Sequence, residues 1–190
     1  MPVSFGDLVA LDARAPDRLL RYGAEPSQAA ALWLPLGAHR RGSAMPLVVL
    51  VHGGCWLREY DATHAYALAA ALSRDGYGVL VPEYRRVGEK GGGWPGTAAD
   101  IVVAMDHLAR QELPGVNKHH TLLVGHSAGG HLALWVAGRE ADLQPAGLTL
   151  VGAIGLAAIT DIERYARGQS SCQRVTPQLM GGMPEQYPED

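Results

Sequence analysis

The feature that most constrains this chain is an alternation between short apolar runs and segments with helical periodicity. Three of the runs are rich in Val and Leu, as is typical of strands covered on both faces; they are residues 47–51, 79–81 and 121–124. Apolar residues recur with helical spacing at 65–72 and 101–108, and a further helix is expected over 128–139. The alternation predicts an α/β fold with a mostly parallel sheet and helices on both faces.

The pattern extends toward both ends of the chain. Residues 29–34 predict a first strand. Thr97 is in position to cap the expected helix that contains residues 101–108. Residues 148–154 predict a last strand, although periodicity alone does not distinguish it from a buried helix. Residues 1–28 are polar and show little periodicity, so we expect an irregular N-terminal segment. The length fits a single domain over residues 1–190.

Composition excludes several classes of partner. With 47% hydrophobic and 18% charged residues the chain is globular, and its net charge of −3 leaves no basic footprint for nucleic acid or an anionic membrane. The longest apolar run, 148–159, is shorter than the roughly 20 residues that cross a bilayer. No signal-peptide pattern opens the sequence. Because Cys55 and Cys172 make no disulfide framework, we expect a reducing compartment and a cytoplasmic protein.

The sequence GHSAG at 125–129 matches the pattern G-x-S-x-G. It lies between an expected strand and an expected helix, so Ser127 would occupy a tight strand-to-helix turn. The N-terminus of that helix would add free N–H groups and partial positive charge where an oxyanion develops. This context favours a nucleophilic serine. The alternative is a structural turn built from common loop residues.

A second motif, HGGCW at 52–56, follows the apolar run 47–51 directly. Consecutive glycines let the main chain approach a ligand closely. Serine hydrolases of this topology take oxyanion donors from such a loop and from the residue after the nucleophile. Alone, the motif indicates only a Gly-Gly turn. Its place at the tip of a strand upstream of Ser127 favours an oxyanion hole.

Together, HGGCW and GHSAGG resemble the α/β-hydrolase superfamily, in particular its kynurenine formamidase-like and carboxylesterase-like branch. The segments VPEYR at 81–85 and GWP at 93–95 resemble the region between those motifs in that branch. The resemblance implies that Ser127 is the nucleophile that forms an acyl-enzyme. It also implies an oxyanion hole made by the backbone N–H groups of Gly54, Cys55 and Ala128.

A serine nucleophile normally needs a histidine base that is oriented by a carboxylate, and in this fold both follow the serine in the chain. Of the eight histidines only His131 follows Ser127, on the same expected helix. Asp161 follows the last expected strand, but it is better placed to cap the next short helix. His52 is expected to hydrogen-bond the loop backbone. The triad acid and histidine are therefore not found, and the chain resembles the N-terminal two-thirds of the family, truncated before its last strands.

The sequence thus predicts a serine hydrolase acting on small carboxylic esters or N-formyl amides, without a cofactor or metal. The alternative is a catalytically silent, truncated homologue that acts as a binding protein, or a gene fragment. Without the last strands, a sheet edge would be left unpaired. We therefore expect a homodimer or a complementing chain at that edge, besides a small-molecule substrate.

Overall fold

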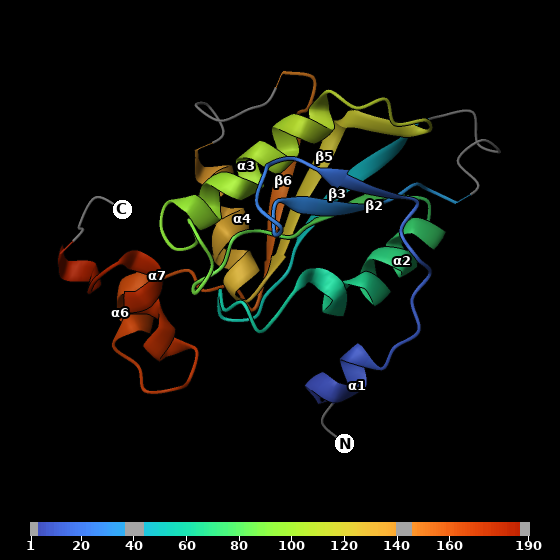
Figure 1. Cartoon of the computed structure of the whole chain (residues 1–190). Helices are drawn as coiled ribbons and strands as arrows, with labels where there is room; N and C mark the ends of the chain where they lie inside the picture. Colours follow the sequence, from blue (N-terminus) through green and yellow to red (C-terminus); the bar gives the residue numbers. More distant parts are fainter. Residues whose placement is uncertain (1–3, 37–43, 140–145, 187–190) are drawn as a thin grey trace.

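The computed structural model describes residues 4–36, 44–139 and 146–186, which form a sheet flanked by helices (Figure 1). Within these residues the sheet has six strands in the order β1-β2-β4-β3-β5-β6. The strands are β1 (Arg18–Arg21), β2 (Ala29–Trp33), β3 (Met45–Val51), β4 (Gly78–Pro82), β5 (Val116–His126) and β6 (Leu150–Leu156). β4, β3, β5 and β6 run parallel, whereas β1 and β2 pair antiparallel at one side.

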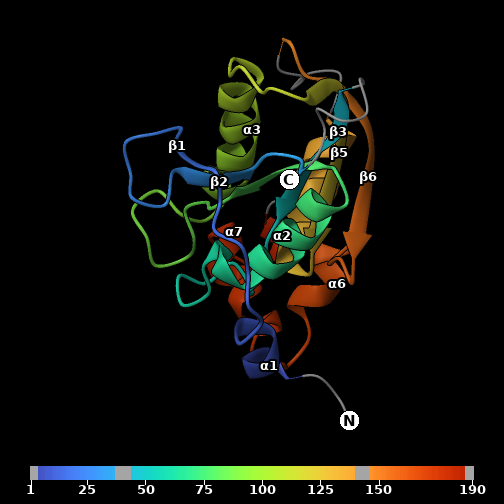
Figure 2. The ribbon, with the colours of Figure 1, turned by 90° about the vertical axis from the view of Figure 1, so that its right-hand side faces the viewer.

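Helices cover both faces of this sheet, as Figure 2 shows. They are α2 (Tyr66–Arg74), α3 (Gly96–Ala109) and α4 (Ala128–Gly138). Because side chains alternate along a strand, Val48 packs on the α2 face while its neighbour Val49 packs in the cluster that contains α3 and α4. None of the helices in the described ranges is both long and apolar enough to cross a membrane.

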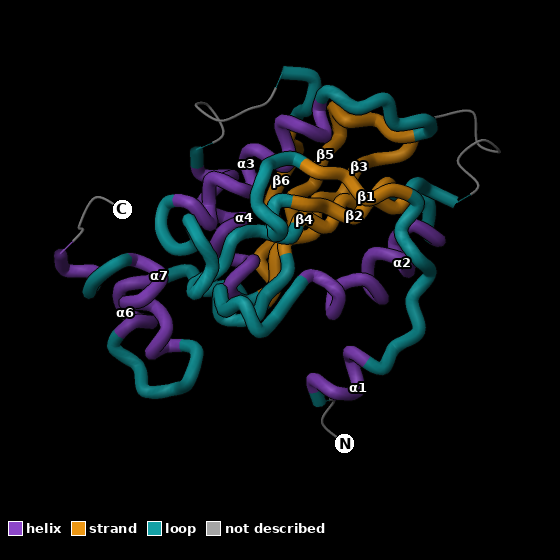
Figure 3. Tube along the Cα trace, viewed as in Figure 1, coloured by secondary structure: helices purple, strands orange, loops and turns teal. Residues whose placement is uncertain are grey.

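Beyond β6 the chain forms a C-terminal helical segment, residues 162–186, made of short helices joined by loops (Figure 3). Its elements are α6 (Ile162–Ala166), η3 (Gln173–Val175), α7 (Thr176–Met180) and η4 (Pro184–Gln186). Leu179 and Met180 are buried in the main core. The Trp94 N–H also donates to the Leu179 carbonyl over 2.7 Å. The segment therefore lies at the end of the sheet where the parallel strands finish.

The expected parallel sheet with helices on both faces is confirmed, and element ends differ from the predictions by only a few residues. The strand expected over 148–154, for example, is β6 at Leu150–Leu156.

Two local predictions are wrong. Thr97 does not cap α3, because Pro95 is the N-cap and the buried Thr97 hydroxyl instead donates to the Arg85 carbonyl over 2.6 Å. Residues 1–28 are not irregular throughout: their described part contains β1 and a short helix, α1 (Phe5–Val9), with a capping box. Periodicity missed β1 because its four residues alternate between half-buried and exposed at the sheet's edge.

The opposite edge is β6, a strand without a charged residue. Val151 is 57% exposed, and Ile154 and Leu156 are more than 40% exposed. Ile154 pairs with Val124, and Leu156 pairs with His126. The Ile154 and Leu156 side chains therefore lie on the same face of the sheet as α2, which covers that face over other strands. An uncharged edge strand with exposed apolar side chains is a surface on which another polypeptide strand could pair.

Candidate active site

Ser127 lies on the turn that joins β5 to α4, as its motif predicts. Its backbone has φ 53° and ψ −118°, a conformation that costs energy in a residue with a side chain. Two hydrogen bonds hold it there: the Ser127 N–H donates to the Leu156 carbonyl over 2.9 Å, and the Ser127 carbonyl accepts from the His131 N–H over 3.1 Å. The strained turn is thus fixed by β6 on one side and α4 on the other.

The two sequence motifs touch each other at glycines. A Cβ at Gly129 would come closer than 3.0 Å to the carbonyl oxygens of Val51 and His52. A Cβ at Gly53 would stand 2.9 Å from the His126 carbonyl and 3.4 Å from the Ser127 Cβ. The loop after β3 and the Ser127 turn after β5 therefore pack backbone against backbone, which only residues without a side chain allow here.

The loop at 52–56 has an unusual backbone. Gly54, Cys55 and Trp56 have φ of 108°, 54° and 57° in succession. The N–H groups of Gly54, Cys55 and Ala128, the predicted oxyanion donors, make no hydrogen bond with any described residue. Such free N–H groups beside a nucleophile are what an oxyanion requires.

His52 is buried under this loop and bonds in two directions. Its Nδ1 lies 2.8 Å from the Gly53 carbonyl oxygen, which confirms the predicted contact with the loop backbone, and its Nε2 lies 2.8 Å from Glu83 Oε1. The Tyr84 hydroxyl donates to the His52 carbonyl over 2.9 Å, and the two rings stack. Burial, reinforced by the Glu83 carboxylate, raises the pKa of Tyr84, so this hydroxyl keeps its proton and remains a donor.

Sequence reasoning gave Glu83 no role. The one feature of the sequence that could have indicated a role for Glu83 is its position directly after β4. The carboxyl ends of neighbouring parallel strands meet at one edge of the sheet, where sites are usually found.

The two cysteines form a disulfide, contrary to the prediction. Cys55 in the loop and Cys172 in the C-terminal helical segment are 117 residues apart in sequence, yet their Cα atoms are 5.0 Å apart. That spacing suits a disulfide. The pairing was missed because a cysteine count contains no information about distant contacts in the fold.

Ser127 lines an open cavity of about 560 Å³. Most of its other lining residues follow β6 or belong to the C-terminal helical segment: Ala157, Ala158, Ile159, Thr160, Asp161, Arg164, Tyr165 and Gln173. The lining mixes apolar and polar side chains, and its volume suits a small organic molecule.

None of the histidines in the described ranges hydrogen-bonds to Ser127 Oγ. His131 instead contacts Trp56 and Trp94, at ring distances of 5.5 and 6.1 Å, and burial lowers its pKa to about 4. His126 lines a separate apolar cavity with His52 and His64.

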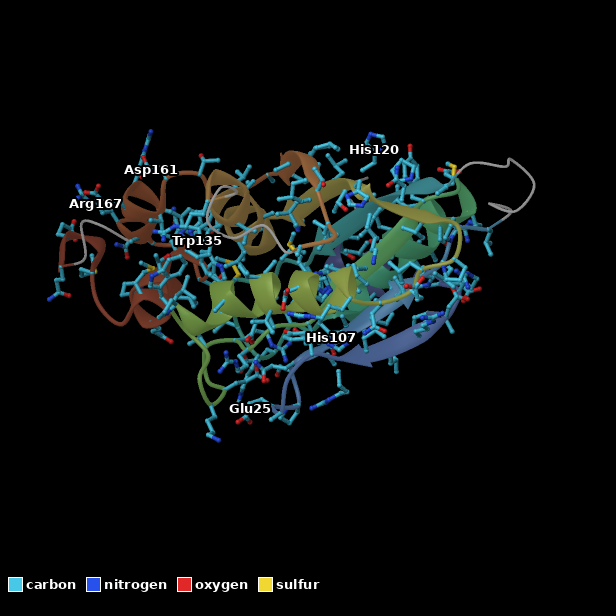
Figure 4. All side chains as sticks on the ribbon, turned by 90° about the horizontal axis from the view of Figure 1, so that it is seen from above. Glu25, His107, His120, Trp135, Asp161 and Arg167 are labelled. Atoms are coloured by element: carbon cyan, nitrogen blue, oxygen red, sulfur yellow. A yellow bond between two sulfur atoms is a disulfide. The ribbon has the colours of Figure 1, made fainter. Side chains whose placement is uncertain are left out.

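Asp161 is an N-cap, as expected, and accepts from the Arg164 N–H over 2.8 Å. Figure 4 shows it beside the C-terminal helical segment, at the other end of the molecule from His120. In the described ranges, no three His, Cys, Asp or Glu side chains gather closely enough to hold a metal ion. These residues therefore bring Ser127 and the N–H groups of the loop together, without a base in the described ranges that contacts the serine.

β5, the turn at Ser127 and α4 follow one another as the nucleophile region does in α/β-hydrolases, and the chain has the fold of that superfamily. Within the superfamily it belongs to the BD-FAE family, whose model matches residues 34–186.

Three proteins described as esterases are similar to this chain. Esterase LipC of Mycobacterium tuberculosis is 27% identical over 117 residues, which are 61% of this chain and 28% of LipC. The crystal structure of esterase B from Lactobacillus rhamnosis superposes with a TM-score of 0.76 at 25% identity, covering 94% of this chain and 61% of that one. A bacterial heroin esterase shares the fold, with a TM-score of 0.73 at 19% identity over 98% of this chain and 62% of its own. The chain thus spans less than two thirds of the length of these relatives.

Proposed function

We propose that Ser127 is the nucleophile of an esterase that hydrolyses small carboxylic esters through an acyl-enzyme. The observation that supports this most is the position of Ser127, on a strained strand-to-helix turn beside a cavity of about 560 Å³. In the reaction, Ser127 Oγ attacks the ester carbonyl carbon and loses its proton to a base. The tetrahedral intermediate then expels the alcohol, and water hydrolyses the acyl-serine.

The N–H groups of Gly54, Cys55 and Ala128 are proposed to bind the negative oxygen of the intermediate. Each donor of this kind contributes about 2.7–4 kcal/mol to the transition state. The resemblance to kynurenine formamidases adds N-formyl arylamides as a second substrate class. The same attack on a formyl carbon would release an arylamine in place of an alcohol.

A second copy of this chain or a complementing polypeptide is proposed to pair with the outer edge of β6. That edge is uncharged and exposes Val151, Ile154 and Leu156. Sedimentation of the isolated chain distinguishes the two, because a stable dimer would favour a second copy.

A catalytically silent binding protein is the second candidate. It is favoured by the lack of any hydrogen bond between Ser127 Oγ and a histidine in the described part of the chain. In that case the cavity beside Ser127 would bind a ligand without turning it over.

A fluorophosphonate, which reacts with activated serines, tests both candidates. We expect the intact mass of the chain to rise by one adduct, and the Ser127→Ala variant to stay unlabelled. If the chain is labelled, untreated protein should then be assayed on short-chain aryl esters and an N-formyl arylamide. Oxyanion stabilisation alone accelerates hydrolysis about 10³–10⁴-fold over the reaction in water. Only an acceleration above that range would therefore indicate a complete site. A folded chain that is not labelled would refute the esterase proposal and support the binding protein.

A cytoplasmic location remains a prediction from the sequence. The Cys55–Cys172 disulfide counts against it, since such bonds persist mainly in oxidising compartments. Alkylation of free thiols in freshly lysed cells tests it, because a reduced pair would be alkylated at both cysteines.

A further inference from the structure

The side chain of His52 is fully buried between two hydrogen-bond acceptors. Its Nδ1 faces the Gly53 carbonyl oxygen and its Nε2 faces the Glu83 carboxylate, both over 2.8 Å. A neutral imidazole has one N–H and can satisfy only one of them. Both contacts are satisfied together only when each ring nitrogen carries a proton, or when Glu83 is itself protonated.

The surroundings of Glu83 favour the ionised carboxylate. Its oxygens accept from the backbone N–H groups of Ala62, over 2.9 Å, and Tyr84, over 3.1 Å. The Arg86 guanidinium lies 3.4 Å from Oε2. Three donors directed at one carboxyl group stabilise its negative charge. With Glu83 as an acceptor, both contacts of His52 are satisfied only when each ring nitrogen carries a proton.

Other titratable groups surround this pair. His64 packs edge-on to the His52 ring at 5.5 Å, and burial, followed by the charge of His52, lowers the pKa of His64, so it does not add a second positive charge near neutral pH. Asp61, His126 and the Tyr84 hydroxyl complete the set. Tyr84 keeps its proton. Neither Asp61 nor His126 replaces Glu83 as the hydrogen-bond partner of His52 Nε2.

The pair is linked to the oxyanion loop through a single peptide unit. In a trans peptide the C=O and N–H point in opposite directions. His52 holds the Gly53 carbonyl on one side, so the following N–H, that of Gly54, is directed to the other side. Tyr84 holds the carbonyl of His52 in the same way. The orientation of one buried ring thus sets the direction of a proposed oxyanion donor.

We propose that Glu83 is a positioning residue for the oxyanion hole. It keeps His52 protonated on both ring nitrogens, and His52 then fixes the peptide that presents the Gly54 N–H to the oxyanion formed at Ser127. Glu83 does not touch the substrate. This inference deepens the proposed esterase function and rests on it for its catalytic meaning.

Glu83→Gln tests the proposal against Glu89→Gln, which removes a carboxylate that also pairs with Arg86 but does not contact His52. We expect Glu83→Gln to lower kcat on an aryl ester about 10- to 100-fold, part of the 10²–10³-fold loss when an oxyanion donor is removed, with KM changed less than about twofold. The control should stay within about twofold in both constants. Equal losses in both variants would refute the positioning role.

Two measurements do not depend on activity. Nitrogen-15 NMR of the histidine rings at pH 7, with His52 assigned through His52→Gln, should show two protonated nitrogens in the wild-type chain. The backbone amide chemical shifts of Gly54 and Cys55 should change in Glu83→Gln and not in Glu89→Gln, because only the first variant removes the acceptor at His52 Nε2.

These readouts separate the two ideas. A wild-type His52 with one protonated nitrogen refutes the positioning role of Glu83, even if the chain is an active esterase. An inactive wild-type chain that gives the expected NMR results refutes the esterase function. It leaves intact the inference that Glu83 and His52 fix the orientation of the Gly54 peptide. If Glu83→Gln fails to fold, the wild-type NMR spectrum decides.

Discussion

Replacing Gly129 by alanine should damage the molecule at the contact between its two motifs. The added Cβ would approach the carbonyl oxygens of Val51 and His52 to less than 3.0 Å. Both atoms belong to the backbone at the end of β3, so neither can rotate away as a side chain could. Relief requires the start of α4 to move away from β3, and with it the turn that holds Ser127.

The expected cost is at the upper end of overpacking, about 3 kcal/mol, because two backbone atoms are overlapped at once. For a chain of this length each kcal/mol lowers Tm by about 2–4 °C, so we expect a decrease of about 6–12 °C. Fluorophosphonate labelling should slow as well, since the displaced helix carries the Ala128 N–H.

Gly138→Ala is the matched control, because it makes the same substitution in the same helix. Among the described residues, a Cβ at Gly138 meets no atom within 4 Å. Alanine at this helical position should stabilise the chain by about 0.5–1 kcal/mol. Calorimetric melts of the two variants and the wild type provide the comparison. A Gly129→Ala variant that melts within 2 °C of wild type would refute the close-packing argument.

Three further predictions concern stability and association. The pKa of His131 is lowered to about 4, so below about pH 6.5 the unfolded chain binds a proton at this site that the folded chain does not. The free energy of unfolding should therefore fall by about 3 kcal/mol between pH 6.5 and pH 4, and urea titrations should show a smaller fall in His131→Leu. Cys172→Ala opens a loop of 117 residues and should cost about 3–5 kcal/mol in urea unfolding; an unchanged midpoint under non-reducing conditions would mean that the disulfide does not constrain the chain. Val151→Lys places a charge on the exposed β6 edge and should reduce self-association in sedimentation, whereas Val103→Lys on α3, also exposed, should not.

Local sequence patterns were sufficient for most of the secondary structure. β3 and β4 are continuous apolar runs because both of their faces are covered, and α2 shows helical spacing because only one of its faces is buried. The turn at Ser127 was also visible, because G-x-S-x-G lies between a strand and a helix within one short stretch of chain. β1 was not visible, since half-exposed residues on a short strand leave little periodicity.

The sequence by itself therefore determined the α/β fold, the place of Ser127 and the identity of the loop that contacts it, because each depends on neighbours in the chain. Only the tertiary structure decided that Glu83 binds His52, 31 residues away, and that Cys55 meets Cys172. It also decided that the Thr97 hydroxyl bonds back to Arg85 and leaves the helix cap to Pro95. These contacts join residues from different elements, and their partners are selected by how strands and helices pack, which no local pattern encodes.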